Sequence, residues 1–377
     1  MPDEVMRARV LVASIPLPAN RFLVDLNSAL SAYCDLVHSS DVFWKMEGDY
    51  DIVHLHFPEY VTFEIEAAYQ RGLEQPLIDA MEERLAFWAE RSNIVVTRHV
   101  LLPHDALSDP MWEKMYETVY TYADGVVHFA KASIEEFRER YAHVAFQSGR
   151  EPAHAIIPHH NYCSLPNHVG RAAARKALGI PVDASVMLVF GAIRHDAERQ
   201  LLLDTFRQLD APRKVLLVSR WRERLANVSW IRLKYWIRDL NRLYYRLHPR
   251  YRFNYGFVEE ADTQLYLNAA DVLFIPRLWV LNSGNITLGM TFGRVVVGPD
   301  AWDVGELLRE TGNPVFDPDR PETAAASLGR GFRLAAEGVV GASNRALALS
   351  EWSAHRCAEE YLRFFADLAR RKVAGIQ

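Results

Sequence analysis

The sequence predicts an α/β fold made of two doubly wound domains, each built on a parallel sheet. The chain has 377 residues, more than one ordinary hydrophobic core accommodates. Short apolar, β-branched runs alternate with longer helical patterns almost throughout, as in sheets that helices cover on both faces. A segment with prolines, glycines and a short basic helix interrupts this alternation once, at 160–185. We therefore expect a domain boundary near residue 165.

The expected strands form two groups, one on each side of that boundary. The first group is 9–15, 51–57, 93–99, 125–130 and 154–159. The second group is 186–191, 214–219, 271–276 and 294–298. Helical patterns between them include 77–90, 132–142 and 199–209, and 343–371 has the periodicity of one C-terminal helix. The prediction is a Rossmann-like domain at 1–165, a second at 166–350, and a terminal helix at 351–377.

Composition restricts the possible functions. Half of the residues are hydrophobic and about a quarter are charged, a balance typical of soluble globular proteins. The net charge of −5 argues against a chain-wide binder of polyanions, so any basic function is local. Cys34, Cys163 and Cys357 lie far apart and form no CxxC pair, which favours reduced thiols in a cytoplasmic protein. We expect neither a signal peptide nor a membrane span.

Ligands of doubly wound sheets bind beyond the carboxyl ends of the strands, so the residues after each strand are the candidates for a site. The segment after the first strand lacks GxGxxG, and NAD or FAD is therefore not expected. Asn20 in that segment either caps the next helix or contacts an acceptor. His54 and His56 share one strand face at a spacing that suits zinc, but no third ligand is evident and we expect no metal. Two such domains in tandem form a cleft between the carboxyl ends of their strands, and Glu59 is expected at the mouth of this cleft.

Two histidines follow the next strand, His99 and His104. Histidine titrates near neutrality, so they suit proton transfer or a hydrogen bond to a sugar hydroxyl. His159 and Tyr162 lie in the polar loop at the expected domain boundary. That loop either faces the cleft or serves only as a hinge.

The second half of the chain contains features that favour phosphate. Gly191 follows a strand, and Arg194 stands near the start of the next helix, where an anion is favoured. Arg277 ends a later strand, and the segment 282–285, Asn-Ser-Gly-Asn, leads into a short apolar helix. Ser283 or Asn282 can cap that helix, while Gly284 lets a ligand approach its free N–H groups. The alternative is an ordinary capped helix.

Seven segments in order resemble the GT-B-fold glycosyltransferases, specifically a bacterial exopolysaccharide-type branch of the large family that uses nucleotide-activated sugars. The segments are DIVHLHFPE, VVTRHVLLPH, ADGVVHFAKASIEEF, IIPHHNY, LGIPVDASVMLVFGAIR, LNAADVLFIPRLWVLNSG and FGRVVVGPDAWDVGEL. The resemblance implies two Rossmann-like domains facing a central cleft, with the C-terminal helix crossing back. It also implies an N-terminal acceptor domain, a C-terminal donor domain, and catalysis without a metal or any cofactor besides the donor.

The resemblance also assigns roles to residues. Arg194 matches an arginine near the donor diphosphate, and Asn282, Ser283 and Gly284 match the loop that contacts the donor. His99 matches the histidine at a strand end that faces the reacting sugar, and His104 matches the second histidine of the same loop. His159 matches the histidine of the family's Pro-His-Gly-Asn-Tyr loop. Arg277, Asn285 and Glu306 are included as donor-binding residues. The chain departs from the family in two main ways. The usual lysine after the arginine is absent, with Arg199 as its possible substitute. The family's pair of glutamates, E-x7-E, is also absent, and the position of the second glutamate falls near Leu288–Gly289.

Residues 220–252 form a basic, aromatic segment with ten Arg or Lys and two acids. Apolar residues recur in it at helical spacing, with basic residues largely off that stripe. An anionic membrane surface would contact Trp230, Lys234, Trp236, Arg238 and Arg242. In the alternative, the stripe packs on the protein itself and the arginines are solvated. RNA binding is a third, weaker alternative, because no RNA-binding motif accompanies the charge.

The expected activity is transfer of a sugar from a nucleotide diphosphate sugar to a hydroxyl of a glycan or lipid-linked glycan. Without the glutamate pair, inversion is slightly favoured, with His99, His104 or Glu59 as the base. Two alternatives stay open: a sugar-nucleotide epimerase of the same architecture, and a non-catalytic scaffold.

Overall fold

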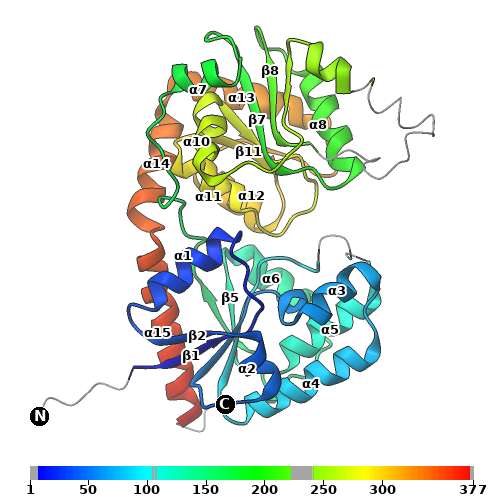
Figure 1. Cartoon of the computed structure of the whole chain (residues 1–377), viewed down its shortest axis with the longest axis vertical. Coiled ribbons are helices and arrows are strands. Elements are labelled where there is room, and N and C mark those ends of the chain that lie inside the picture. Colours follow the sequence, from blue (N-terminus) through cyan, green and yellow to red (C-terminus); the bar gives the residue numbers. More distant parts are fainter. Residues whose placement is uncertain (1–6, 104–105, 107, 222–239, 241, 374–377) are drawn as a thin grey trace, which may run out of the picture. The chain divides into compact units, whose positions relative to one another are not determined.

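The computed structural model describes residues 7–103, 106, 108–221, 240 and 242–373. Its contacts divide the chain into two compact units (Figure 1). Unit 1 comprises Met1–His160 and Trp352–Gln377, and unit 2 comprises Asn161–Glu351. The chain thus enters unit 2 slightly before the expected boundary at 165 and leaves it at the end of a helix. Each unit holds one six-stranded sheet, in which every strand pair is parallel.

The sheet of unit 1 has the strand order β2-β1-β3-β4-β5-β6. Its strands are β1 (Arg9–Val12), β2 (Asp35–His38), β3 (Ile52–Leu55), β4 (Asn93–Thr97), β5 (Gly125–His128) and β6 (Ala153–Ile156). Its helices are α1 (Arg21–Leu30), α2 (Ser40–Lys45), the 3-10 turn η1 (Pro58–Tyr60), α3 (Phe63–Arg71), α4 (Gln75–Ala89), α5 (Pro110–Thr121), α6 (Lys131–Arg140) and α15 (Ala354–Val373). Polar side chains cap four of these helices, namely Asn20, Ser39, Thr62 and Asp109.

Alternate residues of these strands pack into two cores, one on each face of the sheet. On one face, Val10 and Val127 pack with residues of α1 and α15. On the other face, Leu11 and Val126 pack with Trp88 of α4 and with residues of α5. Burial on both faces explains why the strands are continuously apolar in sequence.

The sheet of unit 2 has the order β12-β11-β10-β7-β8-β9. Its strands are β7 (Val186–Ala192), β8 (Val215–Arg220), β9 (Tyr251–Phe253), β10 (Val272–Phe274), β11 (Val295–Pro299) and β12 (Val315–Phe316). Its helices include α7 (Arg171–Ala177), α8 (Asp196–Gln208), α10 (Glu260–Ala269), α11 (Gly284–Thr291), α12 (Trp302–Glu310), α13 (Thr323–Glu337) and α14 (Val339–Glu351). The two α/β units confirm the predicted fold class.

The structure corrects the sequence analysis in three places. It contains three short strands that the apolar pattern did not indicate, β2, β9 and β12. The strand β9 begins at Tyr251, so the last two residues of the basic segment 220–252, which had been interpreted as helical, are in a strand. The expected single helix at 343–371 is two helices, α14 and α15, because the chain breaks at Trp352 and Ser353 where it passes between the units.

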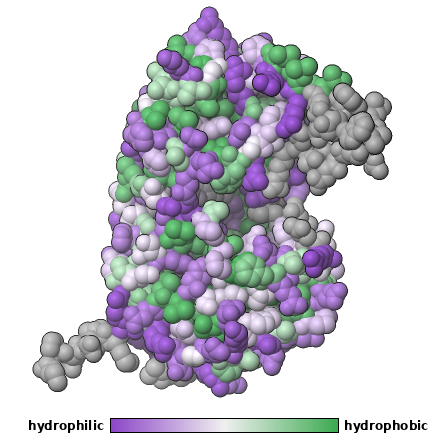
Figure 2. Space-filling view, in the orientation of Figure 1, coloured by the Kyte–Doolittle hydropathy of each residue, from purple (hydrophilic) through white to green (hydrophobic). Residues whose placement is uncertain are grey.

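The surface is chemically mixed. In the view of Figure 2, hydrophilic and hydrophobic side chains are interspersed on both units. Within the described ranges, no helix combines the length and the apolar character needed to cross a bilayer. All three cysteines are free thiols, two of them buried.

Gly125 of β5 tests how closely α15 packs on the sheet. A Cβ atom at this position would lie 2.7 Å from Phe364 Cζ and 2.8 Å from Leu368 Cδ1. Both side chains are nearly buried, so they have little room to move. We expect Gly125→Ala to destabilise unit 1 by about 1–3 kcal/mol, through overpacking. Calorimetric thermal unfolding measures this as a lower Tm.

Gly329→Ala is the matched control, because Gly329 lies in the middle of α13 and its added methyl group would meet only the end of Arg333, 4.0 Å away. Alanine favours a helix by about 0.5–1 kcal/mol over glycine, so the control should raise the stability. Equal effects of both substitutions would contradict close packing of α15.

Candidate functional site

The strand order of unit 2 identifies one place on its sheet where a ligand is expected. The chain begins in the middle of the sheet at β7, moves outward through β8 to β9, and then returns to β10 on the other side of β7. The connections from β7 and β10 therefore run in opposite directions and leave a crevice at the carboxyl ends of these two strands. This reversal is the topological switch point, where doubly wound sheets bind ligands.

The end of β7 is shaped by a bulge around Gly191. The register with β8 shifts between Val189 and Ala192. Gly191 has φ +89°, a left-handed conformation that favours glycine, and no atom lies within 4 Å of the position of a Cβ. Its N–H donates to Ser219 Oγ at 2.7 Å. The bulge therefore leaves open space beside the backbone at the carboxyl end of the strand.

Glu198 joins the two strand ends. This buried carboxylate on α8 accepts the Arg194 N–H at 2.8 Å through one oxygen and Arg277 Nε at 3.0 Å through the other. Within the described part of the chain, the Arg277 guanidinium has no other hydrogen bond, so its two terminal nitrogens are available to an anion. The sequence analysis named both arginines but missed Glu198. Its only sequence signal is its place in the first turn of a helix, four residues after Arg194.

The N-terminus of α11 completes this site. Ser283, one of the two residues suggested as a cap, occupies the N-cap position, but its side chain makes no capping hydrogen bond. Among the described residues, the N–H groups of Gly284 and Asn285 have no acceptor. Asn285 Nδ2 instead donates to the Phe190 carbonyl at 2.8 Å, which ties the start of α11 to the end of β7. We name Arg194, Arg277, Glu198 and the N-terminus of α11 the switch-point cradle.

The other predicted donor residues are placed as follows. Arg194, which belongs to the cradle through its backbone N–H, has an exposed side chain. The Arg199 guanidinium lies 5.1 Å from the centre of the Trp221 ring and 3.6 Å from Asp196, so it is directed to the end of β8. Asn282 precedes the cradle helix, and Glu306 lies on α12; both are half-buried.

In unit 1, the candidate histidines form a buried aromatic cluster around Phe22 of α1. His99, His159 and His160 have ring centres 4.7–4.9 Å from that of Phe22, and His56 lies at 5.8 Å. His56 Nδ1 and His99 Nε2 share a hydrogen bond of 3.1 Å. We name this set the histidine cluster. It brings together residues that follow β3, β4 and β6 at the carboxyl ends of their strands.

Burial keeps these imidazoles neutral. It lowers the pKa of His54 and of His159 to about 3, and it also lowers the pKa of His56 and His99. His54 Nε2 is hydrogen-bonded to Thr97 Oγ1 at 2.8 Å, and Thr97 contacts the Tyr361 hydroxyl of α15 at 3.0 Å. A neutral imidazole can accept a proton, but burial makes these rings weak bases.

Glu59 is placed differently from the expectation. It is buried in η1 rather than at an open mouth, and it accepts a hydrogen bond from the Tyr116 hydroxyl at 2.7 Å. Burial raises its pKa to about 7, despite the opposing hydrogen bonds. The carboxyl group is thus poised near neutrality but shielded. His104, the other candidate base, lies outside the described residues.

The remaining candidates for acceptor binding, Asn20, His159 and Tyr162, do not lie in one unit. Asn20 caps α1, because its side chain accepts the Leu23 N–H at 3.4 Å. His159 belongs to unit 1, whereas Tyr162 belongs to unit 2, where its N–H donates to Thr291 Oγ1 at 3.2 Å. In the part of the chain that the structure covers, no group of three or more His, Cys, Asp or Glu is arranged to hold a metal.

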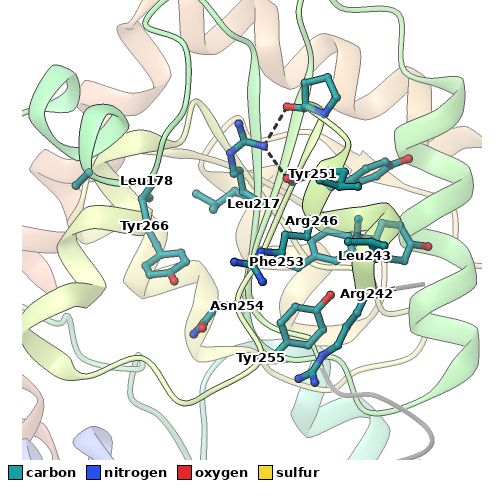
Figure 3. Close-up of a pocket in the computed structure, with 15 residues that line it drawn as sticks. Leu178, Leu217, Arg242, Leu243, Arg246, Tyr251, Phe253, Asn254, Tyr255 and Tyr266 are labelled. Carbon is teal, nitrogen blue, oxygen red and sulfur yellow. Dashed lines mark hydrogen bonds between the residues drawn. The ribbon is translucent and has the colours of Figure 1, made fainter. Parts of the chain in front are cut away.

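The basic segment 220–252 is described only in part, since Trp230, Lys234, Trp236 and Arg238 lie outside the described residues. The described apolar side chains of its stripe are exposed: Leu240 by 65%, Leu243 by 51%, Tyr244 by 54% and Leu247 by 72%. They are exposed in large part, although the Tyr244 ring lies 6.4 Å from that of Tyr251 in β9, so neither interpretation of the stripe is decided by the described residues. Arg242 and Arg246 line a groove of about 1020 Å³ with Tyr251 and Tyr255 (Figure 3).

Comparisons with known proteins identify the fold. No family model and no curated protein sequence matches the chain. Solved structures match along nearly the whole chain. Sucrose-phosphate synthase from Thermosynechococcus elongatus aligns with a TM-score of 0.65 and 15% identity, over 96% of this chain and 99% of that one. The chain has the GT-B fold.

Two further GT-B structures support this assignment. HepE from Anabaena, in complex with UDP-glucose, aligns with a TM-score of 0.64 and 14% identity, over 96% of this chain and 100% of that one. A glycosyltransferase from Rickettsia africae aligns with a TM-score of 0.61 and 12% identity, over 96% and 98% of the two chains. The resemblance that the ordered segments indicated is thus confirmed at the level of the fold.

The buried histidines of this GT-B chain predict acid sensitivity. The pKa of His54 and His159 is about 3 in the folded state, against 6.5 for an ordinary histidine. Between these values the unfolded chain binds more protons, so the stability present above pH 6.5 decreases as the pH falls. Each of the two histidines should cost about 2 kcal/mol at pH 5 relative to pH 7.5. Denaturant unfolding at both pH values measures the difference.

The carboxyl group of Glu59 changes the stability with pH in the opposite direction. The raised pKa of Glu59 adds stability as the pH falls below 7, but a single group does not offset several buried histidines. In His54→Gln, the loss of stability between pH 7.5 and pH 5 should shrink by about 2 kcal/mol. If the pH dependence of stability is unchanged in this variant, His54 is protonated in the folded protein as readily as in the unfolded chain, and its lowered pKa is refuted.

Proposed function

We propose that the protein transfers a sugar from a UDP-sugar to a hydroxyl of a glycan or lipid-linked glycan. The switch-point cradle is the observation that carries this proposal. It offers the terminal nitrogens of Arg277, the exposed Arg194 and two helix N-terminal amides at adjacent strand ends. Arginine and helix N-termini are the usual partners of phosphate oxygens. The GT-B neighbour HepE is described in complexes with UDP-glucose and with UDP, which supports a uridine donor.

In this proposal, the cradle stabilises the leaving diphosphate. Negative charge grows on the diphosphate as the bond to the sugar breaks. Arg277 is already fixed by Glu198, so little reorganisation accompanies the reaction. The guanidinium groups of Arg194 and Arg277 and the amides of Gly284 and Asn285 would then supply the charge stabilisation, and no metal is needed.

We assign acceptor binding to unit 1 and favour inversion, which needs a base for the acceptor hydroxyl. Glu59 has the better-matched pKa, about 7, but Tyr116 shields it. His99 is neutral and is buried against Phe57, with their rings 4.2 Å apart. Deprotonation by either residue would require the acceptor to reach a buried group, so His104 remains the third candidate.

We further propose that the basic segment binds the anionic surface of the cytoplasmic membrane. Leu243, Tyr244 and Leu247 are exposed on the helical residues 242–247, together with the exposed Arg242 and Arg246. Apolar side chains among arginines match the interface of an anionic bilayer. A lipid-linked acceptor would be held at the same surface.

The decisive test of the proposed transfer starts with thermal shifts in the presence of UDP-, GDP- and dTDP-sugars. We expect a UDP-sugar to raise Tm, because a ligand that binds the folded state stabilises it by mass action. Arg194→Ala should then lower transferase turnover by about 100-fold or more, as for a lost charge-stabilising donor. Its Tm without ligand should be unchanged, since the side chain is exposed.

Arg330→Ala is the control for that variant, because Arg330 is an exposed arginine on α13 and is not a member of the cradle. It should retain full turnover. If no nucleotide sugar stabilises the wild-type protein, the proposed donor binding is wrong. Full turnover in Arg194→Ala would remove this arginine from the mechanism.

Vesicle co-sedimentation tests the membrane proposal. The protein should bind vesicles that contain phosphatidylglycerol and not those of phosphatidylcholine alone, and binding should weaken with salt. Leu243→Ser with Leu247→Ser should reduce binding by at least about tenfold, because each leucine contributes about 1.5–3 kcal/mol when it is fully buried in the bilayer and less when it is partly buried. Phe63→Ser, at a 69% exposed position of α3, should have no effect. Equal binding by all three proteins would refute a membrane role of this face.

A further inference from the structure

Two tryptophans of unit 2 lie together in loops that follow the strands β10 and β11. Trp279 lies between β10 and α11, and Trp302 begins α12. Their ring centres are 5.4 Å apart with planes inclined at 58°. Trp279 is 52% exposed although it is followed by the buried Val280 and Leu281. The neighbouring residues thus anchor the loop in the core while the indole stays at the surface.

The backbone at Trp302 is strained, and the surrounding contacts hold it in place. Its φ is +39°, an outlier for a bulky side chain. The Asp300 N–H donates to the Phe316 carbonyl at 2.7 Å, and Asp300 is paired with Arg309. A Cβ on Gly305 would come within 2.8 Å of the Asp300 backbone, so this turn is as tight as a glycine permits. Such strain persists only where the neighbours enforce it, and it concentrates at binding sites.

The tryptophan pair lies in the same connection as part of the switch-point cradle. Arg277 precedes Trp279 by two residues, and the open N-terminus of α11 begins five residues after it. A sugar bound through its diphosphate to Arg277 and α11 would extend from this connection. An exposed indole offers such a sugar a flat, electron-rich face.

We propose that Trp279 and Trp302 form a stacking subsite for a pyranose ring. One face of a pyranose is lined with C–H groups, which pack against an aromatic face, and the hydroxyl groups point outward to water or polar side chains. The ring belongs either to the donor sugar or to a sugar of the acceptor glycan, since both present the same chemistry. This inference rests on the proposed function, because the cradle places the subsite beside a nucleotide sugar.

Isothermal titration of the full-length protein separates the two sources. The probes are UDP, UDP-glucose, UDP-galactose and UDP-N-acetylglucosamine, and the acceptor probes are cellobiose and maltose. For a donor subsite, Trp279→Ala should weaken binding of the preferred UDP-sugar by about three- to tenfold and leave UDP binding unchanged. For an acceptor subsite, the same variant should leave both unchanged and weaken disaccharide binding by a similar factor.

Three controls make the result decisive. Trp279→Phe keeps an aromatic face and should restore most of the affinity. Phe63→Ala removes an exposed aromatic ring from unit 1 and should change nothing. Trp302→Ala should match Trp279→Ala, and the double variant should be no weaker than either, because stacking between two rings is lost with the first.

The outcomes distinguish this proposal from the proposed function. Unchanged affinity for every probe in Trp279→Ala, or an equal loss for UDP and the UDP-sugar, would overturn the stacking subsite and leave nucleotide-sugar binding intact. If the wild-type protein binds none of the UDP-sugars, both proposals are overturned.

Discussion

The arrangement at the switch point of unit 2 depends on one buried carboxylate. Glu198 uses its two oxygens for two different strand ends, the Arg194 backbone after β7 and the Arg277 guanidinium after β10. A buried charge is costly unless it is paired and hydrogen-bonded, so this carboxylate restricts where both partners lie. Because β7 and β10 are neighbours only through the reversal of strand order, the same topology that creates the crevice also creates this link. The exposed groups of the cradle are therefore positioned by this buried carboxylate.

The two units present opposite chemistry at the carboxyl ends of their strands. Unit 2 has arginines and open amides, which favour anions. Unit 1 has neutral, buried imidazoles packed on Phe22. These rings favour uncharged hydroxyl groups as ligands and oppose the binding of a second anion only weakly. This division matches a reaction in which one substrate is a diphosphate and the other is an alcohol. The same burial that keeps the imidazoles neutral explains why the unit is expected to lose stability in acid.

The strands were predictable because nearly all of them are buried on both faces and are therefore continuously apolar. The strands β2, β9 and β12 were not, since they are short and carry polar or aromatic residues at the sheet edges or beside them. Arg194, Arg277 and Gly284 could be identified because each follows a strand along the chain. Glu198 and Ser219 could not, since their roles depend on which strands become neighbours. The sequence also left open whether Ser283 or Asn282 caps α11. Ser283 is buried and does not cap this helix, whose first turn is tied to β7 by Asn285.

The return of the chain to unit 1 at Trp352 has a consequence for biosynthesis. Unit 2 is continuous, whereas the core of unit 1 is completed by α15, whose Phe364 and Leu368 cover Gly125 of β5. During translation, the ribosome produces all of unit 2 before it produces this helix. Unit 2 can therefore complete its hydrophobic core before unit 1 can. This order is the reverse of the usual one, in which the N-terminal domain folds first. Until α15 emerges, the face of the first sheet that it shares with α1 stays only partly covered, and apolar residues of that face are exposed in the nascent chain.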